Sequence, residues 1–200
     1  MSNIVFHKNV LDENLINHIK KYVIDNKASK KWQTSMFWPE FIQKTSTTVS
    51  VLSLDDNKKI CKELRKIYNK LIPETKKMGM EVNYYIWPPL SYIPFHDDSH
   101  KQVASTIYLN KDWHIDWGGL FLYKEKDKIL AEVPEWNKLI IQTDKEWHCT
   151  TSITRPYYLP ELINGTVEIV SDMRTTLQIF VPEELTEYKD LEELKQKYEK

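Results

Sequence analysis

The sequence predicts a mainly β protein with supporting α-helices on one face, organised as a β-sandwich or jelly roll. Helical apolar stripes occur within the first 80 residues, and short β-rich runs separated by turn residues follow from Glu81 to Pro182. A chain of 200 residues with 41% hydrophobic content suits one globular domain. We therefore expect a single domain. Residues 1–80 would give helical support and the first strands, residues 81–182 the β core, and residues 183–200 a charged, helical tail.

The first 80 residues predict two helices and one strand. Between Asp12 and Lys27, apolar residues repeat at helical spacing, and Asp12 is placed to cap the first turn. Residues 56–77 carry a second stripe, which Pro73 is expected to end or kink. Residues 45–54 have the β-branched content of a strand.

The β-rich part of the chain contains a series of short strand-like runs. These runs are 82–86, 103–109, 120–123, 139–143, 149–154, 166–170 and 175–181, and an aromatic run at 92–95 precedes the second of them. Turn residues such as Pro88-Pro89 and Gly118-Gly119 separate the runs. Many short strands after two helices favour a layered β core over an α/β fold.

Composition argues against several classes of function. The net charge is −1 and the interior segments contain no basic block, which argues against nucleic acid as a partner. Two cysteines without metal-type spacing indicate neither a disulfide framework nor a structural zinc site. The N-terminus shows no cleavable hydrophobic segment, and no apolar run approaches about 18 residues. We expect a soluble, cytoplasmic protein without a membrane partner; its oligomeric state stays open.

Three residues carry the main chemical signal. His96 and Asp98 stand two apart after a strand-like run, so a continuing strand would point both side chains to the same side. His148 follows far enough along the chain for antiparallel strands to bring it back beside them. Two imidazoles and one carboxylate can hold a ferrous ion and leave other coordination positions open. The sequence therefore predicts His96, Asp98 and His148 as the metal ligands and catalytic centre of a non-haem iron oxygenase.

The motif alone is weak, because the chain contains a second His-x-Asp pair, His114 and Asp116. That pair lies in a polar stretch ending at Gly118-Gly119, which is typical of a loop or hairpin turn. The first pair lies between two strand-like runs, where rigid elements can fix ligand geometry. We therefore prefer His96, although a hydrogen-bonded structural role remains the alternative for any single histidine.

Arg174 is the second informative residue, since the chain has only three arginines. It stands at the head of an otherwise apolar strand and after His148, a position that suits a buried cation better than a solvated one. A buried guanidinium can hold a cosubstrate carboxylate through two parallel hydrogen bonds. Thr176 lies on the same face and would add a hydroxyl. The alternative is a surface ion pair, for example with Asp172.

Taken in order, these pieces resemble the 2-oxoglutarate- and Fe(II)-dependent dioxygenases, most closely their prolyl 4-hydroxylase-like branch. The matching segments are Tyr85, 91–98, 107–113, 117–123, 137–140, 147–148 and Arg174, which span roughly half of the chain. In this family the metal-binding pair precedes the Tyr-Leu-Asn strand and the glycine pair follows it. His96 and Asp98 fit that order, whereas His114 and Asp116 do not.

The resemblance implies a double-stranded β-helix (jelly roll) that binds Fe(II), 2-oxoglutarate and O₂, with ascorbate as a supporting reductant. It implies hydroxylation of an unactivated C–H bond, preferably in a prolyl residue of a peptide or protein. It places Arg174, Tyr85, Tyr92 and Thr176 around the cosubstrate. The Asp98 carboxylate favours hydroxylation over halogenation, because family halogenases have a small residue there.

The chain also departs from the family pattern. The family's cosubstrate-binding cation lies nearer the distal histidine, where this sequence has Tyr158. We interpret residues 157–170 as an inserted loop or hairpin, because Arg155 precedes a proline and suits a strand end. Tyr85 also lies farther from the metal pair than is usual in the family.

Alternatives remain at this stage. The aromatic segment 31–41 is either a lid over a peptide substrate or a plug at the sandwich edge. The chain is alternatively a nucleic-acid or small-molecule oxygenase of the same superfamily. A non-catalytic jelly-roll binding protein is the alternative from another class.

Overall fold

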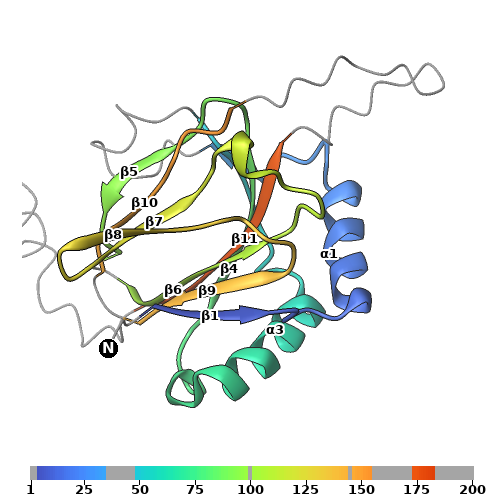
Figure 1. The fold of residues 1–200 in the computed structure, drawn as a ribbon. Coiled ribbons are helices and arrows are strands. Elements are labelled where there is room, and N and C mark those ends of the chain that lie inside the picture. The colour runs from blue at the N-terminus through green and yellow to red at the C-terminus, as the bar shows by residue number, and fades with distance from the viewer. Residues whose placement is uncertain (1–3, 35–47, 99–100, 144–145, 155–172, 183–200) are drawn as a thin grey trace, which may run out of the picture.

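Two antiparallel sheets face each other in the computed structural model, which describes residues 4–34, 48–98, 101–143, 146–154 and 173–182 (Figure 1). One sheet has seven strands in the order β1-β9-β6-β11-β4-β3-β2, and the other has four in the order β5-β10-β7-β8. The strands of the first sheet are β1 (Ile4–Lys8), β2 (Trp32–Thr34), β3 (Ser50–Ser53), β4 (Glu81–Trp87), β6 (Lys101–Tyr108), β9 (Lys138–Gln142) and β11 (Arg174–Pro182); those of the second are β5 (Ile93–His96), β7 (Phe121–Glu125), β8 (Lys128–Glu132) and β10 (His148–Thr150). The predicted jelly roll with supporting helices is confirmed.

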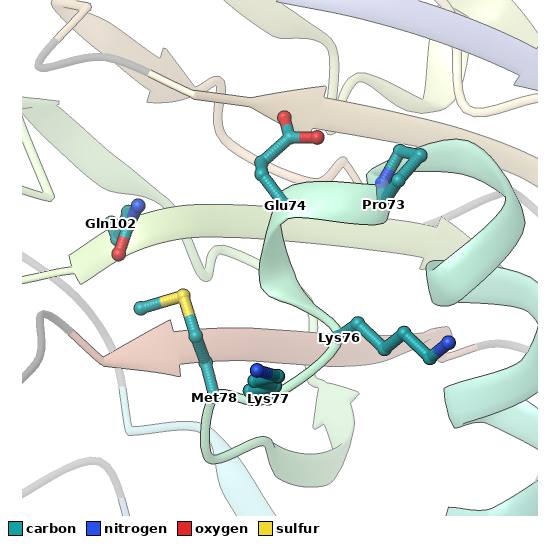
Figure 2. Close-up of a pocket in the computed structure, with 6 residues that line it drawn as sticks. All are labelled: Pro73, Glu74, Lys76, Lys77, Met78 and Gln102. Carbon is teal, nitrogen blue, oxygen red and sulfur yellow. The ribbon is translucent and has the colours of Figure 1, made fainter.

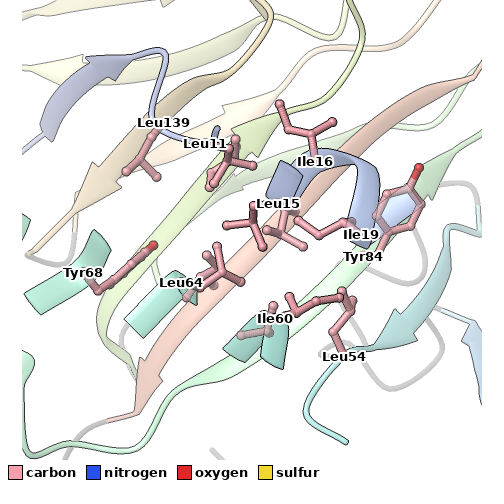
Figure 3. Close-up of a cluster of buried hydrophobic side chains, with 14 of the residues drawn as sticks. Leu11, Leu15, Ile16, Ile19, Leu54, Ile60, Leu64, Tyr68, Tyr84 and Leu139 are labelled. Atoms are coloured by element: carbon pink, nitrogen blue, oxygen red, sulfur yellow. The ribbon is translucent and has the colours of Figure 1, made fainter. Parts of the chain in front are cut away.

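The two faces of the larger sheet contact different parts of the protein. Along β11, Leu177, Ile179 and Val181 are buried in the cluster that both helices cover, whereas Arg174 and Thr176 alternate with them on the face toward the smaller sheet. Figure 3 shows helix side chains packed over this apolar face. The helices thus shield one face of the sheet and leave the other to form the inside of the jelly roll.

The two helices are α1 (Glu13–Asp25) and α3 (Lys58–Leu71). α1 begins where predicted, because the Asp12 side chain accepts a hydrogen bond of 2.7 Å from the Leu15 backbone N–H. The second helix is shorter than the stripe 56–77, and it stops just before Pro73, the residue expected to end or kink it. It ends at Leu71, and a single 3₁₀ turn, η2 (Pro73–Thr75), follows because proline cannot donate the next helical hydrogen bond. Within the described part of the chain, no helix is both long and apolar enough to cross a membrane.

Three described strands, β1, β2 and β8, were not predicted. Each lies at the edge of its sheet, and edge strands are short and rich in polar residues, which weakens their sequence signal. β10 is also shorter than the predicted run 149–154, because Ile153 instead makes an isolated bridge to Gly118. The predicted strand 166–170 and the predicted helical tail 183–200 lie outside the described residues.

Asn137 joins the N-terminal segment to the sheet. Its side-chain amide donates to the Leu11 carbonyl (2.7 Å) and its carbonyl accepts from the Leu11 N–H (2.9 Å), while its own N–H donates to the Tyr108 carbonyl (2.8 Å). The residue is 4% exposed and adopts a φ of 54°, a left-handed conformation that asparagine tolerates better than most residues. A single buried side chain therefore fixes the approach to α1 and the turn before β9.

We expect Asn137→Ala to lower the free energy of unfolding by about 2–4 kcal/mol, because the Leu11 peptide groups lose their partner and alanine disfavours this φ. Urea denaturation measures the loss. Asn137→Gly is the matched control, since it removes the amide without the backbone penalty and should cost less than alanine. A loss below about 0.5 kcal/mol for Asn137→Ala would contradict this role.

Candidate metal centre and buried arginine pocket

β5 and β10 bring the three predicted ligands together. His96 and His148 are direct partners across this antiparallel pair, and their ring centroids lie 4.3 Å apart. Asp98 Oδ1 lies 3.9 Å from His96 Nε2, and Asp98 Oδ2 lies 3.6 Å from His148 Nε2. One candidate ligand atom from each of the three residues lies within 4.8 Å of the others. A single divalent ion fits among them.

Both histidines direct their Nε2 atom toward Asp98, which leaves Nδ1 on the outer side of each ring. His96 Nδ1 lies 2.8 Å from the Pro94 carbonyl, and His148 Nδ1 lies 2.8 Å from the Glu146 carbonyl. A carbonyl oxygen only accepts, so each Nδ1 carries the proton and each Nε2 keeps a free lone pair. Hydrogen bonds of this kind orient metal-binding imidazoles in proteins.

The electrostatics also suit metal binding. Burial and the neighbouring His96 lower the pKa of His148, so its imidazole is neutral at pH 7 and able to donate a lone pair. The Phe121 ring, 5.4 Å from the His148 ring, shields that side of the centre. Asp98 is the most exposed of the three ligand side chains at 22%. The centre is therefore enclosed on the histidine side and more open at the carboxylate.

One step of the sequence argument was wrong. β5 ends at His96, so strand periodicity does not place Asp98 beside it. Asp98 instead lies in the connection to β6, where its carbonyl accepts a hydrogen bond of 2.8 Å from the Lys101 N–H. The turn, rather than the strand, directs the carboxylate toward both imidazoles.

The second His-x-Asp pair lies elsewhere. His114 caps a 3₁₀ turn, η3 (Ile115–Trp117), and its Nδ1 lies 3.3 Å from both the Asp116 N–H nitrogen and the Asp116 carboxylate. Both side chains are more than half exposed. Among the described residues, this pair is not part of the metal-ligating cluster.

Arg174 lies inside the jelly roll. The residue is 1% exposed, and its guanidinium carbon is 5.0 Å from the ring centroids of both Trp87 and Tyr108. Within the described part of the chain, its Nε and Nη1 have no hydrogen-bond partner. This burial excludes the solvated surface ion pair, and Asp172 lies outside the described residues. Burial lowers the pKa of Arg174, although the residue's very high ordinary pKa keeps it charged.

The motif residues around Arg174 hold it in place. The Asn110 side chain makes hydrogen bonds on both sides of Arg174. It donates to the Met173 carbonyl (2.9 Å) and accepts from the Thr175 N–H (2.7 Å). Gly119 adopts a φ of 64°, and a Cβ there would lie 3.1 Å from Arg174 Cδ. The close approach of the Gly119 backbone to the arginine stem therefore requires glycine.

Of the remaining predicted cosubstrate residues, Thr176 and Tyr85 lie near Arg174, whereas Tyr92 lies near β5. Thr176 is fully buried and accepts a hydrogen bond of 2.9 Å from Trp87 Nε1. Tyr85 pairs with Thr176 across β4 and β11 and stacks on Trp87 at 5.8 Å. Tyr92 lies just before β5 and is half-buried. Of the predicted set, Arg174, Thr176 and Tyr85 thus lie together.

The sequence argument missed Trp87 and Tyr108. The structure places Trp87, rather than Tyr85, directly opposite Arg174 across the β4–β11 pair. Tyr108 contacts the other side of the guanidinium, and its hydroxyl has no hydrogen-bond partner among the described residues. Its place in the Tyr-Leu-Asn motif and on the inner face of β6 was the available signal.

Arg174 with its two aromatic neighbours and the metal centre lie in one interior. Tyr108, which contacts Arg174, packs in a buried cluster with Phe121 and Tyr123, and Phe121 in turn contacts the His148 ring. A ligand that bridges the two sheets would thus reach both a metal at His96, Asp98 and His148 and a cation at Arg174.

A separate surface pocket does not contribute to this centre. Figure 2 shows it between η2 and the start of β6. Its lining residues are Pro73, Glu74, Lys76, Lys77, Met78 and Gln102. It contains none of the residues of the metal-ligating cluster.

The described part of the aromatic segment 31–41 favours a structural role for Trp32. This residue lies in β2, packs edge-on against Tyr84 at 6.5 Å, and donates its indole N–H to the Asn26 carbonyl. Residues 35–41, and with them the rest of the lid hypothesis, lie outside the described residues.

Comparison with known proteins supports the fold. No protein-family model and no curated protein matches the sequence. A Pseudomonas putida prolyl-4-hydroxylase matches in structure with a TM-score of 0.63 at 14% identity, over 91% of this chain and 93% of that one. A Trichoplax adhaerens prolyl hydroxylase, in complex with a peptide fragment of the hypoxia inducible factor oxygen degradation domain, gives 0.68 at 13% identity, over 91% and 84%.

A viral collagen prolyl hydroxylase from Paramecium Bursaria Chlorella virus-1, in complex with 2-oxoglutarate, gives a TM-score of 0.60 at 10% identity, over 90% of this chain and 96% of that one. These similarities concern most of both chains in every case. The chain therefore has the fold of the 2-oxoglutarate–Fe(II) oxygenases, including their prolyl hydroxylase branch, as the sequence resemblance predicted.

Proposed function

We propose that this protein is a non-haem Fe(II)- and 2-oxoglutarate-dependent dioxygenase that hydroxylates an unactivated C–H bond. One observation carries the proposal: a two-histidine, one-carboxylate cluster lines the same interior as a buried guanidinium whose Nε and Nη1 find no partner among the described residues. The first fits a ferrous ion, and the second fits the distal carboxylate of a dicarboxylic cosubstrate. Neither feature alone would specify both ligands.

His96, Asp98 and His148 would hold the iron through Nε2, a carboxylate oxygen and Nε2. When bound, the iron supplies the activation of O₂, coupled to decarboxylation of 2-oxoglutarate to succinate. The chain's own contribution is to keep the His148 imidazole neutral, to orient both imidazoles through carbonyl acceptors and to place the Phe121 ring against the centre. Ascorbate would act as a supporting reductant.

Arg174 would bind the distal carboxylate of 2-oxoglutarate. In a buried site a charge-assisted hydrogen bond is stronger than in water, and a guanidinium can donate two parallel bonds to one carboxylate, from Nε with Nη2 or from Nη1 with Nη2. Thr176, on the same face of β11 as Arg174, and Tyr108, whose ring centroid is 5.0 Å from the guanidinium carbon, would add hydroxyl donors, and Tyr85 would line the same interior. Tyr92, half-buried just before β5, would lie nearer the metal.

A prolyl residue in a peptide or protein is the substrate we favour. Support comes from the prolyl hydroxylases among the structural neighbours, one of which binds a peptide fragment. A small-molecule substrate is the second candidate. The epimerase SnoN from nogalamycin biosynthesis also has this fold, with a TM-score of 0.58 at 10% identity, over 90% of this chain and 79% of that one.

The proposal is tested by incubating the protein with Fe(II), ascorbate and 2-oxoglutarate, alone and with proline-rich peptides, while measuring succinate. We expect slow succinate release alone, faster release with an accepted peptide, and one added oxygen atom in that peptide by mass spectrometry. No succinate under any condition would contradict the enzyme class. Succinate without peptide oxidation would move the substrate to the small-molecule class.

We expect His96→Ala and His148→Ala each to abolish binding of Mn(II), used as a redox-inert probe, because each removes one of three ligands. Anaerobic calorimetry measures the affinity, and thermal stability should stay close to that of the unmodified protein. His114→Ala is the matched control and should keep metal affinity and most activity. Equal losses in His96→Ala and His114→Ala would show that the metal site is assigned to the wrong pair.

We expect Arg174→Ala to weaken 2-oxoglutarate binding about 30-fold or more, because truncating one partner of a buried charge pair costs about 2–5 kcal/mol. Titration of the Mn(II)-loaded protein measures this loss, and Mn(II) affinity should survive. Arg155→Ala is the comparator and should bind 2-oxoglutarate almost normally. A large defect in Arg155→Ala with normal binding by Arg174→Ala would reverse the assignment.

A further inference from the structure

Trp87 contacts both residues that would receive the distal carboxylate. It is 1% exposed at the end of β4, where it is the direct cross-strand partner of Arg174. Its ring lies under the guanidinium, with the Arg174 carbon 5.0 Å from the ring centroid, while Tyr108 lies at the same distance. The guanidinium is therefore held between two aromatic rings.

Trp87 also donates a hydrogen bond to Thr176. Its indole N–H donates to the Thr176 hydroxyl oxygen at 2.9 Å, and both groups are buried. An indole N–H is a donor only, so the hydroxyl must use a lone pair to receive it. The hydroxyl hydrogen is then directed away from the indole and remains available as a donor.

We propose that Trp87 is a positioning residue for the cosubstrate carboxylate, holding Arg174 with its ring and orienting the Thr176 hydroxyl with its N–H. The inference rests on the proposed 2-oxoglutarate function and assigns Trp87 no direct contact with the cosubstrate. Without the indole N–H, the hydroxyl is free to rotate and loses its preference for donating toward the guanidinium side. Without the ring, the guanidinium loses one of the two faces that fix its plane.

A role in packing alone would leave a different signature. Trp87 also stacks on Tyr85, so a smaller residue would lower stability whether or not it positions a ligand. A packing defect would weaken every ligand of the interior to a similar extent. A positioning role weakens only ligands that carry a distal carboxylate.

Two probes and a matched substitution separate these roles. The probes are 2-oxoglutarate and oxalate, because oxalate chelates a metal but has no distal carboxylate. Each is titrated calorimetrically into Mn(II)-loaded Trp87→Phe, which keeps an aromatic ring and removes the N–H. Trp32→Phe is the control, since Trp32 also donates one indole hydrogen bond of 2.9 Å but does so on the outer part of the same sheet.

We expect Trp87→Phe to weaken 2-oxoglutarate binding about 3- to 10-fold and to leave oxalate binding unchanged. Trp32→Phe should leave both unchanged. Thr176→Val should weaken 2-oxoglutarate at least as much as Trp87→Phe, and the double variant should be no worse than Thr176→Val alone, because the N–H acts through the hydroxyl. The proposal would be overturned if the losses of 2-oxoglutarate affinity in the two single variants added up in the double variant. It would also be overturned if Trp87→Phe weakened 2-oxoglutarate and oxalate binding equally.

A measurement on the unsubstituted protein covers the case in which Trp87→Phe does not fold. The Trp87 indole N–H resonance, observed by NMR, should shift when 2-oxoglutarate binds and stay in place with oxalate, because donation by the Thr176 hydroxyl strengthens its acceptance from the indole. The Trp32 resonance should not respond to either probe. If the protein binds 2-oxoglutarate and the Trp87 resonance does not shift, the positioning role alone is refuted. If the protein binds neither Mn(II) nor 2-oxoglutarate, the proposed function is refuted as well.

Discussion

The buried charge of Arg174 is the constraint on which the interior of this protein depends. An ion removed from water loses several kilocalories per mole of solvation, and the described residues give its Nε and Nη1 no hydrogen-bond partner. The surrounding structure compensates only in part, through two aromatic faces and a backbone that closes over the arginine stem at Gly119. An anionic ligand would complete the compensation, which is why we assign this position to the cosubstrate carboxylate.

The metal centre depends on a different constraint, the pairing of β5 with β10. Because His96 and His148 are opposite each other across this pair, their relative position is fixed by backbone hydrogen bonds rather than by flexible side chains. Carbonyl acceptors then fix which nitrogen of each ring faces the carboxylate. The larger sheet supplies the cation, and the smaller sheet with the turn after β5 supplies the candidate ligands, so a molecule that contacts both must span the space between the sheets.

The sequence predicted the chemistry of the site better than its geometry. Residue type and order pointed to four residues that the structure places inside the jelly roll, with His96, Asp98 and His148 in one cluster and Arg174 buried. The position of Asp98 beyond the strand end depends on a turn whose conformation the residue spacing does not determine. Trp87 was missed for a related reason, since Tyr85 and Trp87 lie on the same face of β4 and only the pairing register with β11 decides which one is opposite Arg174. Edge strands such as β1 were missed because their residues are only partly buried and do not alternate clearly.

The central claim is that one molecule of 2-oxoglutarate bridges the metal centre and Arg174, and a crystal structure of the protein grown anaerobically with Mn(II) and 2-oxoglutarate tests it most directly. The account predicts one manganese ion with His96 and His148 nitrogens at about 2.0–2.3 Å, by analogy with imidazole–metal bonds generally. It also predicts the Asp98 carboxylate on the metal and the distal carboxylate of the cosubstrate paired with the Arg174 guanidinium. A metal bound elsewhere, or a cosubstrate whose distal carboxylate lies away from Arg174, would contradict it.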